Sequence, residues 1–274
     1  MRSRSRSDGG SVRIDHAVMP PHEPDAFTSI SYVGSIGVSF TGHRRAVRQY
    51  VHGPTVEADI APGASFITSS ADLLWLRVRE PSESLELYPD RDLVDAVGAE
   101  LGASRPSVLP DVSAKDDAVI WGIAATFRAA QLGGRPMTDL EADTRLRLLL
   151  RHVLTTYGGL PQAARPGGRL DARRLSRVVE LIDTRLEGRV VLRELADVAA
   201  LSPFHFLRAF RRTTGLTPHA YVTARRMERA SRMLHSSERP VWEIARRLGY
   251  ANPAHFRMAF RRAFGVAPGE VTRS

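Results

Sequence analysis

A fifty-residue repeat near the C-terminus constrains the fold more than any other feature of this sequence. Several short motifs occur twice at this fixed offset, and each copy contains two consecutive arginines after a phenylalanine. A repeat of this length fits a small helical unit, so we expect two copies of one unit. The matching residues are His205-Phe206 and His255-Phe256, Ala209-Phe210-Arg211-Arg212 and Ala259-Phe260-Arg261-Arg262, Gly215 and Gly265, and Pro218 and Pro268.

Each copy has the start and stop signals of a short helix. A polar residue precedes proline at the start, as Ser202-Pro203 and Asn252-Pro253, and glycine follows the two arginines. A second short helix is expected before each of these, over residues 192–200 and 241–249. Alanine and glycine in these stretches allow two helices to cross closely, so the pattern predicts two helix-turn-helix units.

Basic residues concentrate in the part of the chain that carries the repeat. The chain has 39 Lys and Arg against 30 Asp and Glu, a net charge of +9. From Arg169 onward there are 21 arginines and 10 acidic residues, a net of +11, and the 18 basic and 20 acidic residues before it give −2. Such an excess of cations suits a surface that faces phosphates.

Composition excludes several classes of protein. The chain has no cysteine, which excludes disulfides, thiolate metal sites and cysteine nucleophiles. The first residues are rich in Arg, Ser and Gly with no apolar run behind them, unlike a signal peptide, and no apolar run is long enough to span a bilayer. We therefore expect a cytoplasmic protein with no membrane contact and a disordered tail over residues 1–26.

The expected fold class is α+β. Short apolar or alternating runs between Ser29 and Tyr88, separated by turns, predict strands of a cupin-like barrel. Residues 116–131 and 138–157 have helical periodicity, and these helices either pack into the core or form a homodimer interface. These segments form an expected first domain over 27–160, and a Gly/Pro-rich linker over 161–169 leads to an all-helical domain over 170–274.

An ordered series of motifs extends over the helical domain. It comprises Leu195-Ala196, residues 202–212 and 215–218, Arg226-Met227, Ala230, Pro240-Val241, residues 243–245, Gly249-Tyr250, Phe256, residues 260–262, Phe264-Gly265 and Pro268. With these motifs, residues 191–272 resemble the DNA-binding domain of the AraC family of bacterial transcription regulators. The resemblance implies two recognition helices, near residues 202–213 and 252–263, that enter successive major-groove segments of double-stranded DNA. It also implies an effector-binding domain before the linker.

Helical periodicity assigns the faces of the two recognition helices. Phe206 and Phe210 lie four residues apart, as do Phe256 and Phe260, so each pair faces the core. Arg208, on the opposite face, can make a bidentate contact to guanine, whereas arginines near the helix ends suit phosphates. The candidate DNA-contacting residues are Phe204, His205, Leu207, Arg208, Arg211, Arg212, Arg225, Asn252, Ala254, His255, Arg257, Met258, Arg261 and Arg262.

The sequence departs from the family pattern at three positions. Met258 stands where an arginine is usual, and Arg257 lies one position earlier, which favours unequal base reading by the two helices. Ala267 replaces a serine and Val271 an aromatic residue, so a short final helix is expected.

Three functions are compatible with this sequence. The favoured one is a ligand-responsive transcription activator, with DNA, a small-molecule effector and RNA polymerase as candidate partners. The alternatives are a metal-dependent cupin-type enzyme fused to a DNA-binding domain, and a ligand-independent DNA-binding protein. No His-x-His pair with a following glutamate occurs, so we expect no enzyme, metal or cofactor. Candidate lining residues of an effector site, for which core packing is an equal explanation, are Tyr32, Tyr50, Phe66 and Trp75.

Overall fold

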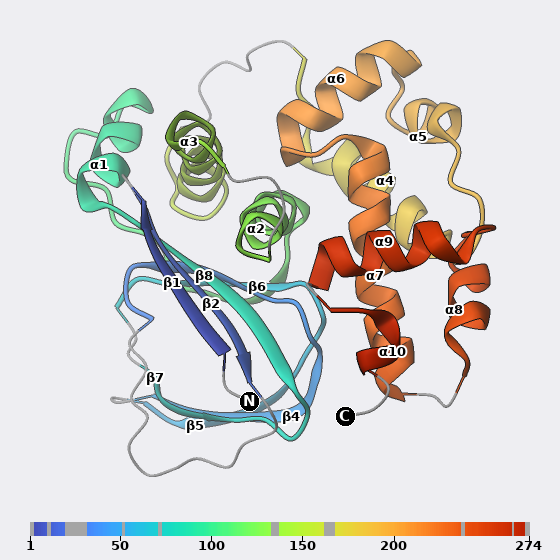
Figure 1. The fold of residues 1–274 in the computed structure, drawn as a ribbon. Helices are drawn as coiled ribbons and strands as arrows, with labels where there is room; N and C mark the ends of the chain where they lie inside the picture. Colours follow the sequence, from blue (N-terminus) through green and yellow to red (C-terminus); the bar gives the residue numbers. More distant parts are fainter. Residues whose placement is uncertain are drawn as a thin grey trace. The chain divides into compact units, whose positions relative to one another are not determined.

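The chain divides into two compact units in the computed structural model (Figure 1). Unit 1 comprises Met1–Ala124 and Met137–Ala164, and unit 2 comprises Ala125–Pro136 and Arg165–Ser274. Residues 125–136, which the sequence analysis assigned to the first domain, thus group with unit 2. Most of the expected linker over 161–169 lies outside the described residues, which are 3–9, 12–19, 32–50, 53–70, 73–132, 137–161, 168–236, 239–264 and 266–271.

The strands of unit 1 form two antiparallel sheets. One has the order β1-β2-β8-β3-β6-β9 and the other β5-β4-β7. Among the described strands no pairing joins the edges of either sheet, so the expected α+β class is confirmed but the strands do not close into one barrel. The strands are β1 (Ser3–Gly9), β2 (Val12–Met19), β3 (Ser35–Ser39), β4 (His43–Tyr50), β5 (Thr55–Ile60), β6 (Ala64–Thr68), β7 (Leu73–Arg77), β8 (Ser82–Pro89) and β9 (Val112–Asp116).

The N-terminal residues correct the sequence analysis. A disordered tail was expected over residues 1–26, but β1 and β2 occupy most of its first nineteen residues, so for these residues the prediction is wrong. The physical reason is pairing between distant parts of the chain, because β2 pairs with β8 along its length and Val12 and Ile14 are buried. Residues 20–26 lie outside the described residues.

Strand β8 forms the centre of the larger sheet and contributes its most buried side chains. Leu85 and Leu87 have no exposed surface and pair with Val38 and Ile36 of β3. Strand β8, from Ser82 to Pro89, lies at the end of the region over which strands were expected. The core therefore forms where apolar residues alternate on neighbouring strands.

Helices α2 and α3 begin with side-chain caps. Thr138 and Glu141 form a capping box at the start of α3 (Asp139–Thr156), which lies within the helix expected over 138–157. At the start of α2 (Ala118–Gln131), Asp117 caps the backbone and also accepts hydrogen bonds from His152 and Tyr157 of the α3 end, both at 2.7 Å. Helix α1 (Arg91–Glu100) was not predicted, and it packs on α3.

The apolar side chains along one face of α3, its apolar stripe, pack in the interior of the chain. Leu146, Leu149, Leu150 and Val153 have no exposed surface. Of the two predicted roles for this stripe, core packing is therefore the one that the structure shows. A dimer through these helices would have to use their exposed side, where Leu140 is 77% exposed.

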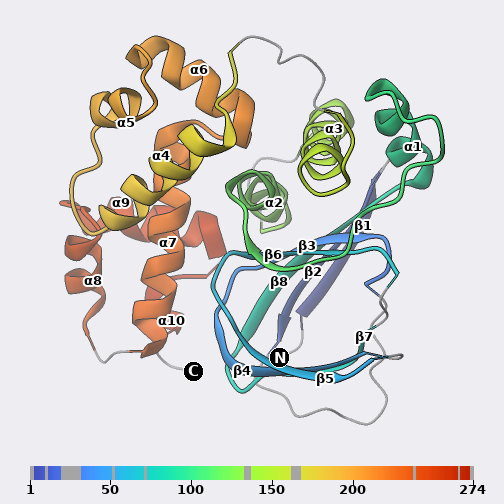
Figure 2. The ribbon, with the colours of Figure 1, turned by 180° about the vertical axis from the view of Figure 1, so that it is seen from behind.

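Unit 2 is helical, and the long helix α7 connects two similar groups of helices (Figure 2). Helix α4 precedes the first group and was not predicted from the sequence. The expected short final helix is α10. The helices are α4 (Ala172–Thr184), α5 (Leu192–Val198), α6 (Pro203–Thr214), α7 (Pro218–Ser236), α8 (Val241–Arg247), α9 (Pro253–Phe264) and α10 (Pro268–Val271).

Candidate nucleic-acid interface

Helix α6 has one buried and one exposed face. Ser202 caps the helix, because its Oγ accepts a hydrogen bond from the backbone N–H of His205, and Pro203 is the first helical residue. Phe206 and Phe210 are fully buried, with ring centroids 5.5 Å apart. The two phenylalanines therefore anchor α6 to the core, as their spacing predicted.

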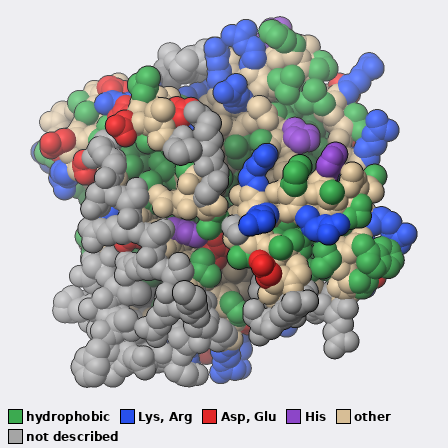
Figure 3. All heavy atoms as spheres, in the orientation of Figure 1, with side chains coloured by type: hydrophobic (Ala, Val, Ile, Leu, Met, Phe, Trp, Pro, Cys, Tyr) green, Lys and Arg blue, Asp and Glu red, His purple; other side chains and the backbone are tan. Residues whose placement is uncertain are grey.

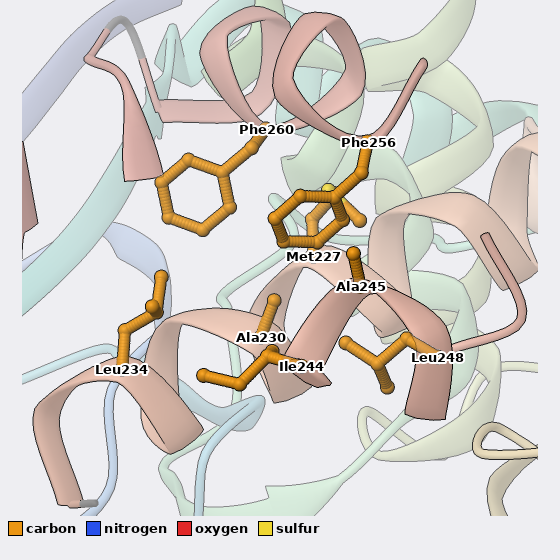
Figure 4. Close-up of a cluster of buried hydrophobic side chains, with 8 residues drawn as sticks. All are labelled: Met227, Ala230, Leu234, Ile244, Ala245, Leu248, Phe256 and Phe260. Atoms are coloured by element: carbon orange, nitrogen blue, oxygen red, sulfur yellow. The ribbon is translucent and has the colours of Figure 1, made fainter. Parts of the chain in front are cut away.

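Helix α9 repeats this arrangement. The Oδ1 atom of Asn252 accepts a hydrogen bond from the backbone N–H of Ala254 at 2.8 Å. Phe256 and Phe260 are fully buried, with ring centroids 5.9 Å apart. Figure 4 shows both rings pointing into a core formed with α7 and α8, and the other residues of this cluster are Met227, Ala230, Leu234, Ile244, Ala245 and Leu248.

The turns between the paired helices are also equivalent. Each contains one residue in the left-handed region, Ala200 with φ 52° and Gly249 with φ 77°. The residue after it donates its backbone N–H to a carbonyl five residues earlier, at 3.0 Å in both turns. Both copies thus fold as helix-turn-helix units, and the expected helix ends at 200 and 249 are corrected to Val198 and Arg247 because the left-handed residue stops the helix.

The candidate contact residues of α6 and α9 lie on the exposed faces. In Figure 3, basic and histidine side chains gather over the part of unit 2 that contains these helices. Arg208, Arg211, Arg257, Arg261 and Arg262 form no ion pair within the described part of the chain, so their charges are available to a ligand. The exposed candidates are Phe204, His205, Leu207, Arg208, Arg211, Arg212, Asn252, Ala254, His255, Arg257, Met258, Arg261 and Arg262.

The two exposed faces differ in the order of their side chains. On α6, Leu207 precedes Arg208, whose guanidinium carbon lies 5.7 Å from the centre of the Phe204 ring. On α9, Arg257 precedes Met258, and the Nε of Arg257 donates to the backbone carbonyl of Pro253 at 3.4 Å. The order of arginine and apolar residue is thus reversed between the two helices. Ala254 occupies the position on α9 that Phe204 occupies on α6, so α9 has no aromatic ring at the position that contacts Arg208 on α6.

Arg225 corrects the predicted contact set. Its Nε and Nη2 donate to the two carboxylate oxygens of Asp183 at 3.0 and 2.7 Å, and Glu228 lies 3.8 Å from its Nη1. Its side chain is only 13% exposed. An arginine with two acidic partners in a buried position stabilises the packing of α4 on α7, so Arg225 is not available to phosphates.

Sequence reasoning also missed an ion-pair cluster around Glu187, which lies between α4 and α5. A signal was present, since acids at 183 and 187 have the same four-residue spacing as arginines at 225 and 229. Complementary charges at equal spacing, on α7 and on the end of α4 with the turn after it, indicate that these two segments lie side by side. This cluster does not belong to the exposed faces of α6 and α9.

Unit 1 contains polar side chains in buried positions. Arg48 of β4 is 8% exposed and lies with its guanidinium carbon 5.5 Å from the centre of the Phe66 ring. Its Nη1 donates to the hydroxyl of Ser113 at 2.9 Å, whereas its Nε is buried without a hydrogen-bond partner among the described residues. Tyr32 and Tyr50 are half-buried, and the side chain of Trp75 lies outside the described residues.

Two kinds of feature are absent from the described residues. Within them, no three or more His, Asp or Glu side chains are grouped so that they could hold a metal ion. None of the described helices has both the length and the apolar composition needed to cross a membrane.

Comparisons with known proteins agree on the C-terminal part of the chain. A model described as a helix-turn-helix domain matches residues 195–274. The probable transcriptional regulator LumQ of Photobacterium leiognathi is 31% identical over 87 residues, which are 32% of this chain and 35% of that protein. The RCS-specific HTH-type transcriptional activator RclR of Escherichia coli is 41% identical over 76 residues, 28% of this chain and 27% of that protein.

Among solved structures, the C-terminal domain of AraT, a response regulator from Geobacillus stearothermophilus, is 31% identical with a TM-score of 0.36. That match covers 38% of this chain and 87% of the solved one. The chain spans about a third or less of the length of the curated relatives named above. Residues 195–274 are thus an AraC-type helix-turn-helix domain.

Proposed function

We propose that this chain is a transcription regulator that binds double-stranded DNA through α6 and α9. The observation that carries the proposal is the repeated arrangement of each helix, with two buried phenylalanines on one side and exposed arginines on the other. A helix held in this way can enter the major groove, and two of them joined by α7 can read successive segments. The N-terminal ends of both helices are exposed, which is where recognition helices contact bases.

The side chains suggest distinct roles within this surface. Arg208 can donate two hydrogen bonds to one guanine, and Phe204 and Leu207 can contact thymine methyl groups. Arg211, Arg212, Arg261 and Arg262 lie in the last turns of their helices, where phosphate contacts are expected. Side chains near the start of the recognition helix would therefore determine which bases are preferred. The arginines in the last turns of both helices would contribute affinity for DNA of any sequence.

We further propose that unit 1 binds a small-molecule effector. Its support is Arg48, because a buried guanidinium with an unsatisfied Nε is costly unless a bound group supplies an acceptor. Activation by such an effector would involve RNA polymerase as a partner. A homodimer remains a proposal that would use the exposed side of α2 and α3.

Selection of binding sites from random DNA with the full chain tests the DNA-binding proposal. We expect an asymmetric site with two contacted elements on one face of the duplex, about 10 base pairs apart. Hydroxyl-radical footprinting of the selected site measures both elements. Arg177→Ala is the control variant, since Arg177 is an exposed arginine of α4 outside the candidate surface, and it should leave the footprint unchanged. A footprint with one contacted segment per chain would contradict the proposal.

A further inference from the structure

Glu187 forms a two-sided ion pair that links three parts of unit 2. One carboxylate oxygen accepts hydrogen bonds from Nε and Nη2 of Arg229 on α7, at 3.3 and 3.0 Å. The other oxygen accepts from Nε and Nη2 of Arg247 at the end of α8, at 3.0 and 2.7 Å. Glu187 itself belongs to the connection that leads into the first helix-turn-helix unit. Glu187 therefore joins the segment that leads into the first helix-turn-helix unit to α8, which is the first helix of the second helix-turn-helix unit.

The backbone on both sides of Glu187 is held by another arginine of α7. Arg226 donates from Nε to the carbonyl of Leu186 at 3.0 Å and from Nη2 to the carbonyl of Gly188 at 2.6 Å. The same guanidinium lies against Gly249, where an added Cβ would come within 3.0 Å of its Nη2. Arg226 thus contacts both the loop over 186–188 and the turn of the second helix-turn-helix unit.

The chain runs from the first helix-turn-helix unit to the second through α7. The contacts of Glu187 and Arg226 provide a second connection between the same two helix-turn-helix units. A single helix can bend or twist, and small changes along it would alter the relative placement of α6 and α9. A second set of contacts, across the loop over 186–188, restricts such changes. Hydrogen bonds from Arg247 and Arg229 lower the pKa of the Glu187 carboxyl below its ordinary value, which favours the charged form that the ion pair requires.

We propose that Glu187 is a positioning residue that fixes the spacing at which α6 and α9 read DNA. The inference rests on the proposed function, because it presupposes that both helices read one site. It gives Arg226, Arg229 and Arg247 a structural role, and so separates them from the arginines that face the phosphates. A brace of this kind would make the protein intolerant of changes in the distance between the two DNA elements.

The test compares two variants of the full chain that lose the same charge. Glu187→Gln removes the carboxylate of the brace. Glu194→Gln removes an equally charged side chain of α5 that pairs with Arg185 at the end of α4, and among the described residues it forms no ion pair with the second helix-turn-helix unit. Each protein is titrated against the selected site and against versions whose two elements are one base pair closer or further apart, which changes both their distance and their rotation about the duplex.

For the wild-type chain we expect about a 10-fold loss of affinity when the spacing changes by one base pair, because DNA or protein must be deformed to retain both contacts. Glu187→Gln should reduce this loss to about threefold or less, and Glu194→Gln should retain the wild-type loss. The ratio of affinities on two DNAs cancels any uniform change in electrostatic attraction. Circular dichroism spectra and unfolding midpoints of both variants verify that they are folded.

Three other results have distinct meanings. If Glu187→Gln keeps the full spacing preference, or if Glu194→Gln loses it equally, the brace is not at Glu187 and the inference is overturned. If the wild-type chain binds its site but tolerates altered spacing, the inference is overturned as well. If the wild-type chain selects no sequence at all, the proposed function itself fails. Should Glu187→Gln unfold, Arg247→Gln against Arg246→Gln repeats the comparison from the other partner of the ion pair.

Discussion

At the scale of single residues, the difference between the two helices lies in adjacent pairs of side chains. Leu207-Arg208 on α6 corresponds to Arg257-Met258 on α9, and only Arg208 has an aromatic ring beneath its guanidinium. A ring at this position favours one orientation of the arginine, which lowers the entropy lost when it binds a base. We therefore expect the first helix to discriminate bases more strongly than the second.

Replacing Arg208 by alanine tests this expectation. Arg208→Ala should cost about 1–3 kcal/mol on the selected site and relax base preference at one position, because two hydrogen bonds to guanine are lost. Met258→Ala should cost clearly less, since methionine offers only apolar contact. Titration of each variant against the site and its single-base changes measures the effect. Equal loss of affinity for all sequences in Arg208→Ala would show that this side chain contacts phosphate instead.

At the scale of elements, the turns of the two helix-turn-helix units can be compared by two substitutions, glycine to alanine in one turn and alanine to glycine in the other. Gly249 has a positive φ, and a Cβ there would press on Arg226, whereas Ala200 occupies the same conformation with a Cβ already present. Gly249→Ala should destabilise the chain by on the order of 1–2 kcal/mol, and Ala200→Gly should stabilise it by up to about 1 kcal/mol. Urea unfolding followed by the helical circular dichroism signal measures both. Shifts of the same sign would refute the assignment of these turns as equivalent.

The elements also show what the sequence could and could not predict. The helix starts at Pro203, Pro253 and Asp139 were predictable because caps and proline act through neighbours in the chain. Strand β2 was missed because its order depends on pairing with β8, about seventy residues away, and not on its own composition. Arg225 was misassigned for the same reason, since its partner Asp183 lies 42 residues earlier.

At the scale of the whole molecule, the sequence indicated correctly that charge is divided between two parts. It did not show how many of the arginines in unit 2 are consumed by internal ion pairs. Arg225, Arg229 and Arg247 pair with Asp183 and Glu187, so the number of arginines in that part overstates the number available to its binding surface. Arginines without acidic partners on α6 and α9 are a better guide to the number of phosphate contacts.

This distinction predicts the salt dependence of binding by a fragment of residues 170–274. If the fragment is an independent DNA-binding unit, it should recognise the same site as the full chain, and its affinity should fall steeply with salt as counterions are released, at a log-log slope of about 0.9 per phosphate contact. Arg261→Ala should lower this slope by about one contact, because Arg261 is exposed and unpaired on α9. Arg177→Ala, an exposed arginine of α4 outside the candidate surface, should leave the slope unchanged. Titrations at several salt concentrations provide the slopes, and a slope near zero, or an equal change in both variants, would mean that net charge alone attracts this domain to DNA.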